Sequence, residues 1–372
     1  MHRTLSLGLA LMILTSCSSQ IKTPGTASPQ DFDQGSISVP IAPPLTETPI
    51  PIPAAERTPP TLPEVFVSPY LDPLDTPQTY IQDNCEYIRN KWDPNKAAPG
   101  TVVLIIMLNS INRGSKPNSS DSITVNQFER LIQNFIEQGF EAINTQQLAG
   151  FLETNSSIPM RSVLLLQDGR HTAENFERHF RVYWEQRSWP VVNGWIIHEN
   201  TPEGLWLDNL ALEQEGFVDH QLYSPLARYS TNASEEYLSD ELSKFVGIFE
   251  NRYHKAPITI IWPGVPGHNF PKAARENGFR LGFTQNARGP IMYNWIPQAE
   301  VKDPHRPAYY PERSFDDPLM TLPRYWPLQV IDILDQVRLT GRAAAEFAEQ
   351  NRQTELDYYS IQCTPEYGPI PE

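Results

Sequence analysis

Histidine and carboxylate side chains stand after several apolar segments of the sequence, where strands would end and loops begin. Imidazole and carboxylate groups are the ligands from which proteins build zinc, nickel and cobalt sites, and a carboxylate also serves as a general base. Asp168 directly follows an apolar run. Histidines with a comparable placement are His171, His198, His220 and His268. One hypothesis is therefore a divalent metal site built from Asp168 and two of these histidines.

The same positions offer a second chemistry, in which two carboxylates cleave a glycosidic bond. Asp168 and Glu199 form the first candidate pair, and Asp219 is a third choice. The separation of two carboxyl groups decides how such a pair acts, and nothing in the sequence fixes it. The glycosidase hypothesis therefore stays open beside the metal site.

Apolar runs of strand length alternate with amphipathic segments from about residue 98 onward. The run 101–108 is continuously apolar, and apolar residues recur at helical spacing within 122–140. Further strands are expected at 161–169, 190–200, 257–264 and 280–286, and further helices at 145–153, 173–188, 233–255, 270–279 and 330–350. Apolar strands separated by helices indicate an α/β fold with a parallel sheet, closed or nearly closed as a barrel.

The N-terminus has the pattern of an export signal. His2 and Arg3 precede an apolar run that is about half the roughly 20 residues needed to span a bilayer, so residues 1–16 read as a signal peptide. The sequence Leu-Thr-Ser before Cys17 resembles the bacterial lipobox. That resemblance implies acylation of Cys17 and anchoring in the bacterial cell membrane or outer membrane, with the domain in the periplasm or outside the cell. An ordinary secretory signal is the alternative.

Residues 17–80 are rich in proline, threonine, serine and alanine. Of the 36 prolines in the chain, 14 lie between residues 21 and 80. Such a segment cannot bury enough apolar surface to fold, and its prolines favour an extended conformation. We therefore expect a disordered linker that separates the membrane from a domain at 81–372; a ligand for partner domains is the alternative.

Charge and cysteine content narrow the class of protein further. With 29 Lys+Arg against 44 Asp+Glu, the net charge of the 372-residue chain is −15, which argues against nucleic acid as a partner.

Beyond Cys17, Cys85 and Cys363 flank the expected domain. An exported protein matures in an oxidising compartment, so we predict a disulfide between these two cysteines. Two buried free thiols are the alternative.

The order of segments over about residues 100–330 resembles the polysaccharide deacetylase family, the NodB-homology carbohydrate esterases. The segment ITVNQFERLIQNFIEQGFEAINTQQLAGFLE resembles the family's opening, and RSVLLLQDG with WPVVNGWII resembles its "VLTFDDG…ATVFV" block. TIIWPGVPGHNFPKAARENGFRLGFTQNARG resembles "FAYPYG…KAAGYKLAFT…G", and MTLPRYWP resembles the late "LPRI" strand. The resemblance implies a distorted (β/α) barrel.

The family's chemistry uses a divalent metal to polarise an acetyl carbonyl and a carboxylate to take a proton from water. The resemblance places Gln167 at the position of the base and Asp168 at that of a metal ligand. An amide cannot accept that proton. Leu222 and Leu226 stand at the two histidine positions, and leucine has no lone pair to offer a metal. The base and two of three protein ligands are therefore replaced.

Other motifs of the family are partly retained. Trp262 and Pro263 stand where the family places a motif with an arginine, and Arg324 lies in the segment that resembles "LPRI". We expect these three residues to contact a substrate. No segment resembles the family's "LLH" strand. The sequence thus predicts a catalytically degenerate member without a cofactor that binds an envelope polysaccharide, a peptidoglycan-type glycan or a partner; the alternative is an active metal-dependent polysaccharide deacetylase with a rearranged site.

Overall fold

The computed structural model describes residues 57–119, 121–169, 171–198, 200–228, 232–264 and 266–371. Residues Ile52–Glu372 form one compact unit. Its strands are β1 (Asp75–Gln78), β2 (Val102–Leu108), β3 (Ser110–Asn112), β4 (Ser122–Thr124), β5 (Glu141–Ala142), β6 (Arg161–Asp168), β7 (Val191–Trp195), β8 (Val218–Tyr223), β9 (Thr259–Ile261), β10 (Leu281–Thr284), β11 (Ile296–Ala299) and β12 (Leu322–Pro323). Its α-helices are α1 (Asn84–Trp92), α2 (Val125–Glu137), α3 (Thr145–Thr154), α4 (Ala173–His179), α5 (Arg181–Arg187), α6 (Glu203–Gln214), α7 (Glu235–Tyr253), α8 (Asn269–Glu276), α9 (Pro327–Tyr358) and α10 (Thr364–Tyr367).

Seven parallel strands form a nearly closed barrel in the order β12-β10-β9-β8-β7-β6-β2. The barrel is closed by hydrogen bonds between β2 and Tyr325, which follows β12. The amide of Tyr325 donates to the carbonyl of Ile105 at 2.9 Å, and the amide of Met107 donates to the carbonyl of Tyr325 at 2.8 Å. The structure therefore confirms the expected α/β fold and its distorted (β/α) barrel.

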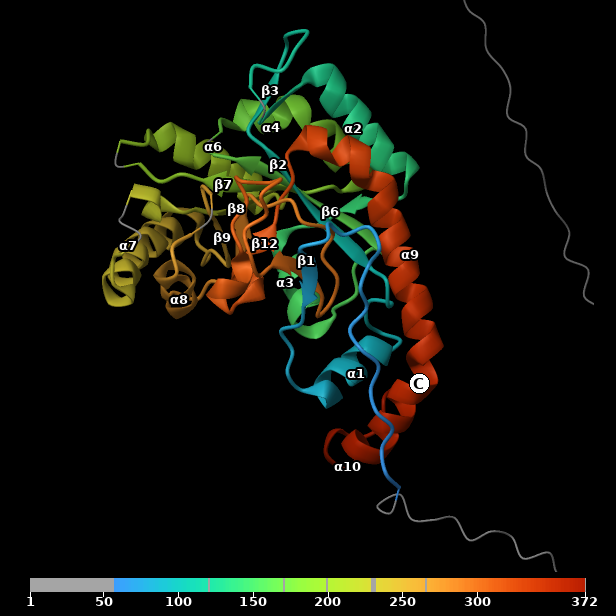
Figure 1. The fold of residues 1–372 in the computed structure, drawn as a ribbon. Helices are drawn as coiled ribbons and strands as arrows, with labels where there is room; N and C mark the ends of the chain where they lie inside the picture. The colour runs from blue at the N-terminus through green and yellow to red at the C-terminus, as the bar shows by residue number, and fades with distance from the viewer. Residues whose placement is uncertain are drawn as a thin grey trace, which may run out of the picture. The chain divides into compact units, whose positions relative to one another are not determined.

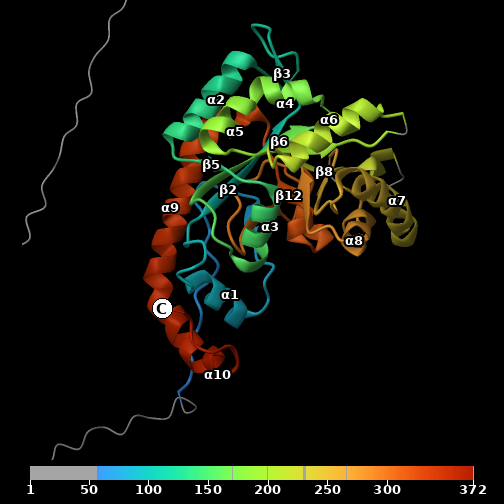
Figure 2. The same ribbon diagram turned by 180° about the vertical axis from the view of Figure 1, so that it is seen from behind.

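Strand alternation sorts the core into an interior and an outer layer. Val103, Ile105, Leu164 and Leu166 belong to one buried cluster with residues of the other barrel strands. Their sequence neighbours pack into a separate cluster against helices: Val102, Leu104, Val163 and Leu165. Figure 1 and Figure 2 show α2 and α9 on the outside of β2 and β6. This alternation decides which strand residues face the barrel axis.

Helix α9 is longer than the expected 330–350 because its buried stripe continues to Glu355. The helix approaches the start of β2 closely at Gly341. A Cβ atom there would lie 2.7 Å from the carbonyl oxygen of Gly100, which itself has φ of +87°. Both positions therefore require glycine. This contact fixes the helix against the end of the barrel at which β2 begins.

The prediction that residues 17–80 form a disordered linker is wrong for the C-terminal part of this range. Strand β1 pairs antiparallel with β11. Upstream of β1, the hydroxyl of Ser68 is 3.0 Å from that of Thr340, and the ring of Phe66 packs on Trp295 and Phe347. These contacts bury apolar and polar groups of the segment, which proline content alone did not predict. Residues 17–56, including Cys17, lie outside the described residues.

Buried charges hold β1 in place. The guanidinium of Arg288 lies 2.7 Å from Asp75 and 2.6 Å from Glu312, and all three side chains are at most 2% exposed. Arg306 adds a second contact to Asp75, at 2.8 Å. Each buried carboxylate is thus paired, as burial of charge requires. The network ties the N-terminal segment to the loop between β11 and β12.

Two differences from the expected elements have local causes. The expected helix 173–188 is divided into α4 and α5 at Phe180, whose φ of −117° interrupts the helical backbone. Helix α6 and strand β8 were not among the expected elements. In β8 only part of the strand is apolar, since Asp219, His220 and Gln221 interrupt the run.

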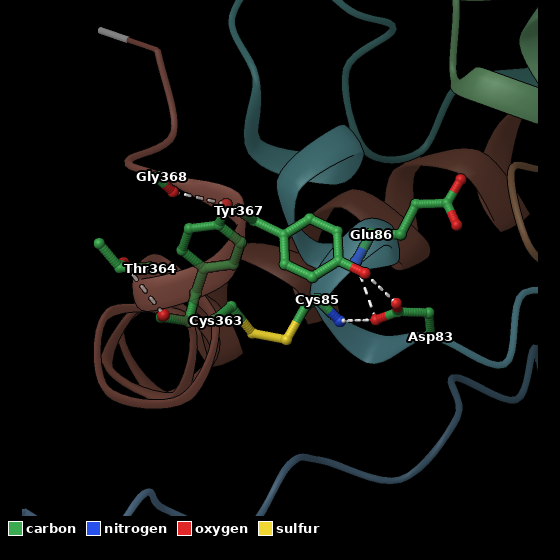
Figure 3. The surroundings of a disulfide bond; sticks show 8 residues. Asp83, Cys85, Glu86, Cys363, Thr364, Tyr367 and Gly368 are labelled. Atoms are coloured by element: carbon green, nitrogen blue, oxygen red, sulfur yellow. Dashed lines mark hydrogen bonds between the residues drawn. A yellow bond between two sulfur atoms is a disulfide. The ribbon is translucent and has the colours of Figure 1, made fainter. Parts of the chain in front are cut away.

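The predicted disulfide is confirmed. Cys85 at the start of α1 is bonded to Cys363, with their Cα atoms 5.3 Å apart. Figure 3 shows that Asp83 accepts hydrogen bonds from the backbone of Cys85 and from the hydroxyl of Tyr367 beside this bond. The disulfide indicates a domain that matures outside the cytoplasm. Within the described ranges, no helix has both the length and the apolar character of a membrane span.

We predict that replacing Cys85 and Cys363 together by serine lowers the free energy of unfolding by about 2–5 kcal/mol. The bond restricts the unfolded chain across a sequence separation of 278 residues, so its loss favours the unfolded state. Urea unfolding of residues 52–372 measures the effect. A thiol reductant should lower the urea midpoint of the parent protein and leave that of the double variant unchanged. Equal midpoints for the parent and the variant without reductant would contradict the prediction.

Candidate functional site

An ion pair lies inside the barrel where β6 ends. Asp168 is the last residue of β6, and Arg324 follows β12 directly. Arg324 Nη1 lies 3.5 Å from Asp168 Oδ2, with the two side chains 0% and 9% exposed. The guanidinium also donates from Nε to the carbonyl of Thr284 at 3.0 Å and from Nη2 to the carbonyl of Trp262. Burial raises the pKa of Asp168, and the positive charge of Arg324 opposes that rise.

The pair is not fully hydrogen-bonded. Asp168 Oδ1 and Arg324 Nη1 have no hydrogen-bond partner among the described residues. Gly194, beside Asp168 in the neighbouring strand, adds no side chain there; a Cβ atom would lie 3.6 Å from Asp168 Oδ1 and 3.5 Å from the ring of Tyr223. The carboxylate therefore retains one unused acceptor and the guanidinium one unused donor, and the surrounding side chains bury both atoms.

Gln167, at the position of the base, faces away from the barrel axis. Its Nε2 atom donates to the carbonyl of Asn109 at 3.0 Å and to that of Leu108, and its Oε1 atom accepts from Asn175 at 3.3 Å. The side chain is fully buried. These bonds link the ends of β2 and β6 to α4. Gln167 is thus held in a structural position and has no exposed group for proton transfer.

The two leucines at the histidine positions lie in the apolar core. Leu222 and Leu226 are both 0% exposed and pack in the cluster that includes Trp195, Trp206 and Phe249. Side chains in this cluster face the covering helices instead of the barrel axis. These positions therefore contribute packing and no donor atom.

The four candidate histidines do not gather around Asp168. His171 Nε2 lies 2.8 Å from the backbone carbonyl of Asp168, and burial lowers the pKa of this histidine. His198 is exposed. His268 is also exposed, and its ring packs on Phe315 at 5.0 Å. The expected metal site is therefore not assembled from these three residues.

His220 and Asp219 lie in a separate buried network near the start of β8. His220 Nδ1 is 3.0 Å from Glu213 and Nε2 is 3.1 Å from Asn209, so both ring nitrogens have partners on α6. Lys255 bridges Glu213 at 2.8 Å and Asp219 at 2.7 Å. Burial lowers the pKa of His220. In the sheet, Asp168 pairs with Gly194 of β7, whereas Asp219 pairs with Val192, two residues earlier in the same strand. Asp219 therefore lies at a different level of the barrel from Asp168.

The remaining candidates are distributed between core and surface. Trp262 is 1% exposed, and its indole donates to the carbonyl of Met320 at 2.9 Å, so its ring is a core element and not the expected substrate contact. Arg324 is likewise buried instead of exposed to a cleft. Pro263 is half-buried. Glu199, the partner of Asp168 in the glycosidase hypothesis, lies outside the described residues.

The residues at this site do not fit a divalent metal. Within the described ranges, no three His, Cys, Asp or Glu side chains are grouped closely enough to hold an ion. Asp168 is the one expected ligand that faces the barrel axis, and a guanidinium already supplies positive charge beside it. A metal would have to compete with that charge. We therefore derive no chemical step through a metal.

One polar residue of the site was not predicted from sequence. Tyr223 is half-buried at the end of β8, and burial raises its pKa to about 12 with Asp168 nearby. Asn193 is also buried, with no partner for its amide among the described residues, but it lies on the outer side of β7 with Val191 and Trp195 and is not part of the site. Strand alternation was the available signal for Tyr223. This last residue of β8 follows Leu222, which faces outward, so Tyr223 must face the barrel axis.

Comparisons with known proteins give fold-level similarities. No family model matches the chain, and no curated protein matches its sequence. A deacetylase of Streptococcus pyogenes in complex with acetate is similar with 15% identity and a TM-score of 0.48, over 65% of this chain and 99% of that one. IcaB from Ammonifex degensii has 16% identity and a TM-score of 0.45, over 66% and 98%. The deacetylase domain of BpsB from Bordetella bronchiseptica has 16% identity and a TM-score of 0.43, over 62% and 97%. Similarity at this level identifies neither the family nor the activity of the chain.

We predict that Arg324→Met lowers the free energy of unfolding at pH 7 by about 3–5 kcal/mol, because it leaves the buried Asp168 carboxylate unpaired. Without the guanidinium the already raised pKa of Asp168 rises further, so the folded variant binds a proton that the unfolded chain releases. The variant is therefore most stable below pH 3.8, the ordinary pKa of an aspartate carboxyl group. It loses stability as the pH rises through the pKa that Asp168 has in the folded variant.

Urea unfolding of residues 52–372 between pH 4 and pH 8 measures this dependence. The matched control is Asp168→Asn in the Arg324→Met background, which removes the titrating group and should remove the additional loss at higher pH. An Arg324→Met defect of the same size at pH 4 and pH 8 would show that the lost stability does not come from an unpaired Asp168.

Proposed function

We propose that this chain is a lipid-anchored protein of the bacterial cell envelope whose domain is a catalytically inactive relative of the polysaccharide deacetylases. In this proposal the domain binds an envelope glycan at the end of the barrel that holds Asp168. The order of the sequence motifs and the barrel support the relationship. The residues of the site support the loss of activity.

The pairing of Asp168 with Arg324 is the observation that carries the proposal. Hydrolysis of an acetyl group by this family's chemistry needs a metal-bound water and a free carboxylate base. Here Gln167 is bonded to backbone carbonyls, and Asp168 is neutralised by a guanidinium. Leu222 and Leu226 pack in the core. The groups present can bind and orient a polar ligand, but none of them is placed to activate water.

A glycan suits the unused hydrogen-bonding capacity of the pair. A sugar hydroxyl both donates and accepts, so in this proposal one hydroxyl donates to Asp168 Oδ1 and accepts from Arg324 Nη1 once the side chains that bury both atoms move aside. The half-buried ring of Tyr223 lies beside this position, near Gly194. An aromatic ring next to charged groups offers both an apolar face and polar contacts to a sugar.

Binding and metal content test the function together. We expect residues 52–372 to retain no stoichiometric zinc, nickel or cobalt by elemental mass spectrometry after exposure to each ion, and to bind glycans on an array of acetylated and deacetylated envelope polysaccharides. Asp168→Leu should weaken that binding by about tenfold, the equivalent of one charge-assisted hydrogen bond. Asp219→Asn, which alters a carboxylate elsewhere in the barrel, is the matched control.

One equivalent of metal that is lost on Asp168→Ala, together with release of acetate from an acetylated polysaccharide, would instead establish an active deacetylase. Binding that is equal in the parent and Asp168→Leu would place the glycan elsewhere. Absence of binding to every glycan on the array would leave a partner protein as the ligand and contradict this part of the proposal.

Lipid anchoring rests on the sequence around Cys17. The disulfide between Cys85 and Cys363 agrees with export. We expect the full chain to incorporate labelled palmitate and to fractionate with membranes when it is produced in bacteria. Cys17→Ser removes the only sulfur in this segment to which diacylglycerol would attach, so both properties should be lost. Unchanged labelling of Cys17→Ser would contradict lipidation at this residue.

A further inference from the structure

A cavity lies at the opposite end of the barrel from Asp168. It has a volume of about 290 Å³, room for roughly ten water molecules. Residues 97–101, which precede β2, form part of its wall, whereas Asp168 ends the parallel strand β6. Figure 1 and Figure 2 show α1 and α10 at this end of the unit and β3 at the other. The cavity is therefore separate from the proposed glycan site.

One face of α1 forms a wall of the cavity. The lining residues Asn84, Tyr87, Ile88 and Lys91 recur at helical spacing, so they share one side of the helix. The disulfide holds the start of this helix to Cys363. This wall is consequently fixed by a covalent bond and does not depend on the short helix alone.

Small side chains of α9 leave the space open. Ala344, Phe347 and Ala348 line the cavity, and Ala344 and Ala348 are 9% and 3% exposed. These positions also lie on one side of their helix. A larger residue at either alanine would project into the cavity. The volume therefore depends on the alanines of a helix that is otherwise closely packed on β2.

The walls combine aromatic rings with a few polar groups. Phe66, Trp295 and Phe347 contribute ring surface. Lys91 Nζ lies 2.8 Å from Glu355, and the indole of Trp92 donates to the same carboxylate at 2.6 Å. The lysine and glutamate neutralise each other, and the third charged residue of the lining is Glu64, so the lining offers no uncompensated positive charge to an anionic ligand.

Hydrogen-bonding groups nevertheless remain in the lining. An ammonium group has three donors, and Lys91 directs one of them to Glu355. The side-chain oxygen of Asn294 accepts from the amides of Tyr80 and Ile81, each at 2.8 Å, while its amide nitrogen has no hydrogen-bond partner within the described ranges. Asn294 is 6% exposed. A few polar donors in a mainly apolar cavity are typical of small-molecule sites.

We infer that this cavity binds a small, uncharged amphipathic molecule with an aromatic ring or short acyl chain and a hydroxyl or amide group. Its apolar part packs on Phe66, Trp295 and Phe347. Its polar group accepts a hydrogen bond from Lys91 or from the amide of Asn294. The inference uses no residue of the Asp168 site, so it stands or fails separately from the proposed glycan binding.

N-phenylnaphthylamine, an uncharged aromatic dye whose emission rises in apolar surroundings, tests the site in residues 52–372 without detergent. We expect saturable binding of one dye per chain. Ala348→Leu should weaken it about tenfold or more, because the added side chain occupies the space. Ala343→Leu is the matched control on the same helix, outside the lining, and should bind as the parent does.

Competition defines the ligand class. Decanol should displace the dye, and decanoate should displace it at least about tenfold more weakly, because the carboxylate finds no uncompensated positive charge. Ala344→Val replaces Ala348→Leu if the latter fails to unfold cooperatively. Unchanged dye affinity in the cavity variants, no binding by the folded parent, or equal displacement by decanoate would overturn the inference.

Discussion

The hydrogen bonds that close the barrel between β2 and Tyr325 determine the position of every other group in the site. They fix the backbone of the segment after β12, and strand alternation then turns Tyr325 toward the outer cluster and Arg324 toward the axis. A guanidinium on the axis requires a carboxylate, because an isolated buried charge is costly. Asp168 at the end of β6 supplies it. The closure of the sheet and the neutralisation of charge are thus two aspects of one arrangement.

This arrangement is accompanied by structural roles for the neighbouring residues. A protein cation lies beside Asp168, and Leu222 and Leu226 add to the outer core. Gln167 is similarly used to join the ends of β2 and β6. The end of the barrel that holds Asp168 is thus packed and hydrogen-bonded. Among the described residues, Asp168 Oδ1 and Arg324 Nη1 are the buried polar atoms of the ion pair that lack a partner.

The barrel could be predicted from sequence because apolar strands and amphipathic helices carry their periodicity in consecutive residues. The disulfide followed from two cysteines at the ends of one domain. The pairing of Asp168 with Arg324 could not be predicted, since residues 156 positions apart meet only through the closure of the sheet. The folded state of residues 66–78 was missed for a similar reason: their order depends on Arg288 and Thr340, far along the chain. Composition describes a segment alone, whereas these contacts belong to the tertiary structure.

The position of the disulfide has a mechanical consequence. Cys85 lies downstream of Phe66 and of β1, so tension applied to the chain before residue 57 reaches these contacts first. The segment 62–66 forms one wall of the cavity beside Trp295. A pull on the N-terminal side would peel this wall away and expose the aromatic lining, while the covalent bond keeps α1 and the barrel joined. The N-terminal segment is therefore the part of the domain that yields first under load.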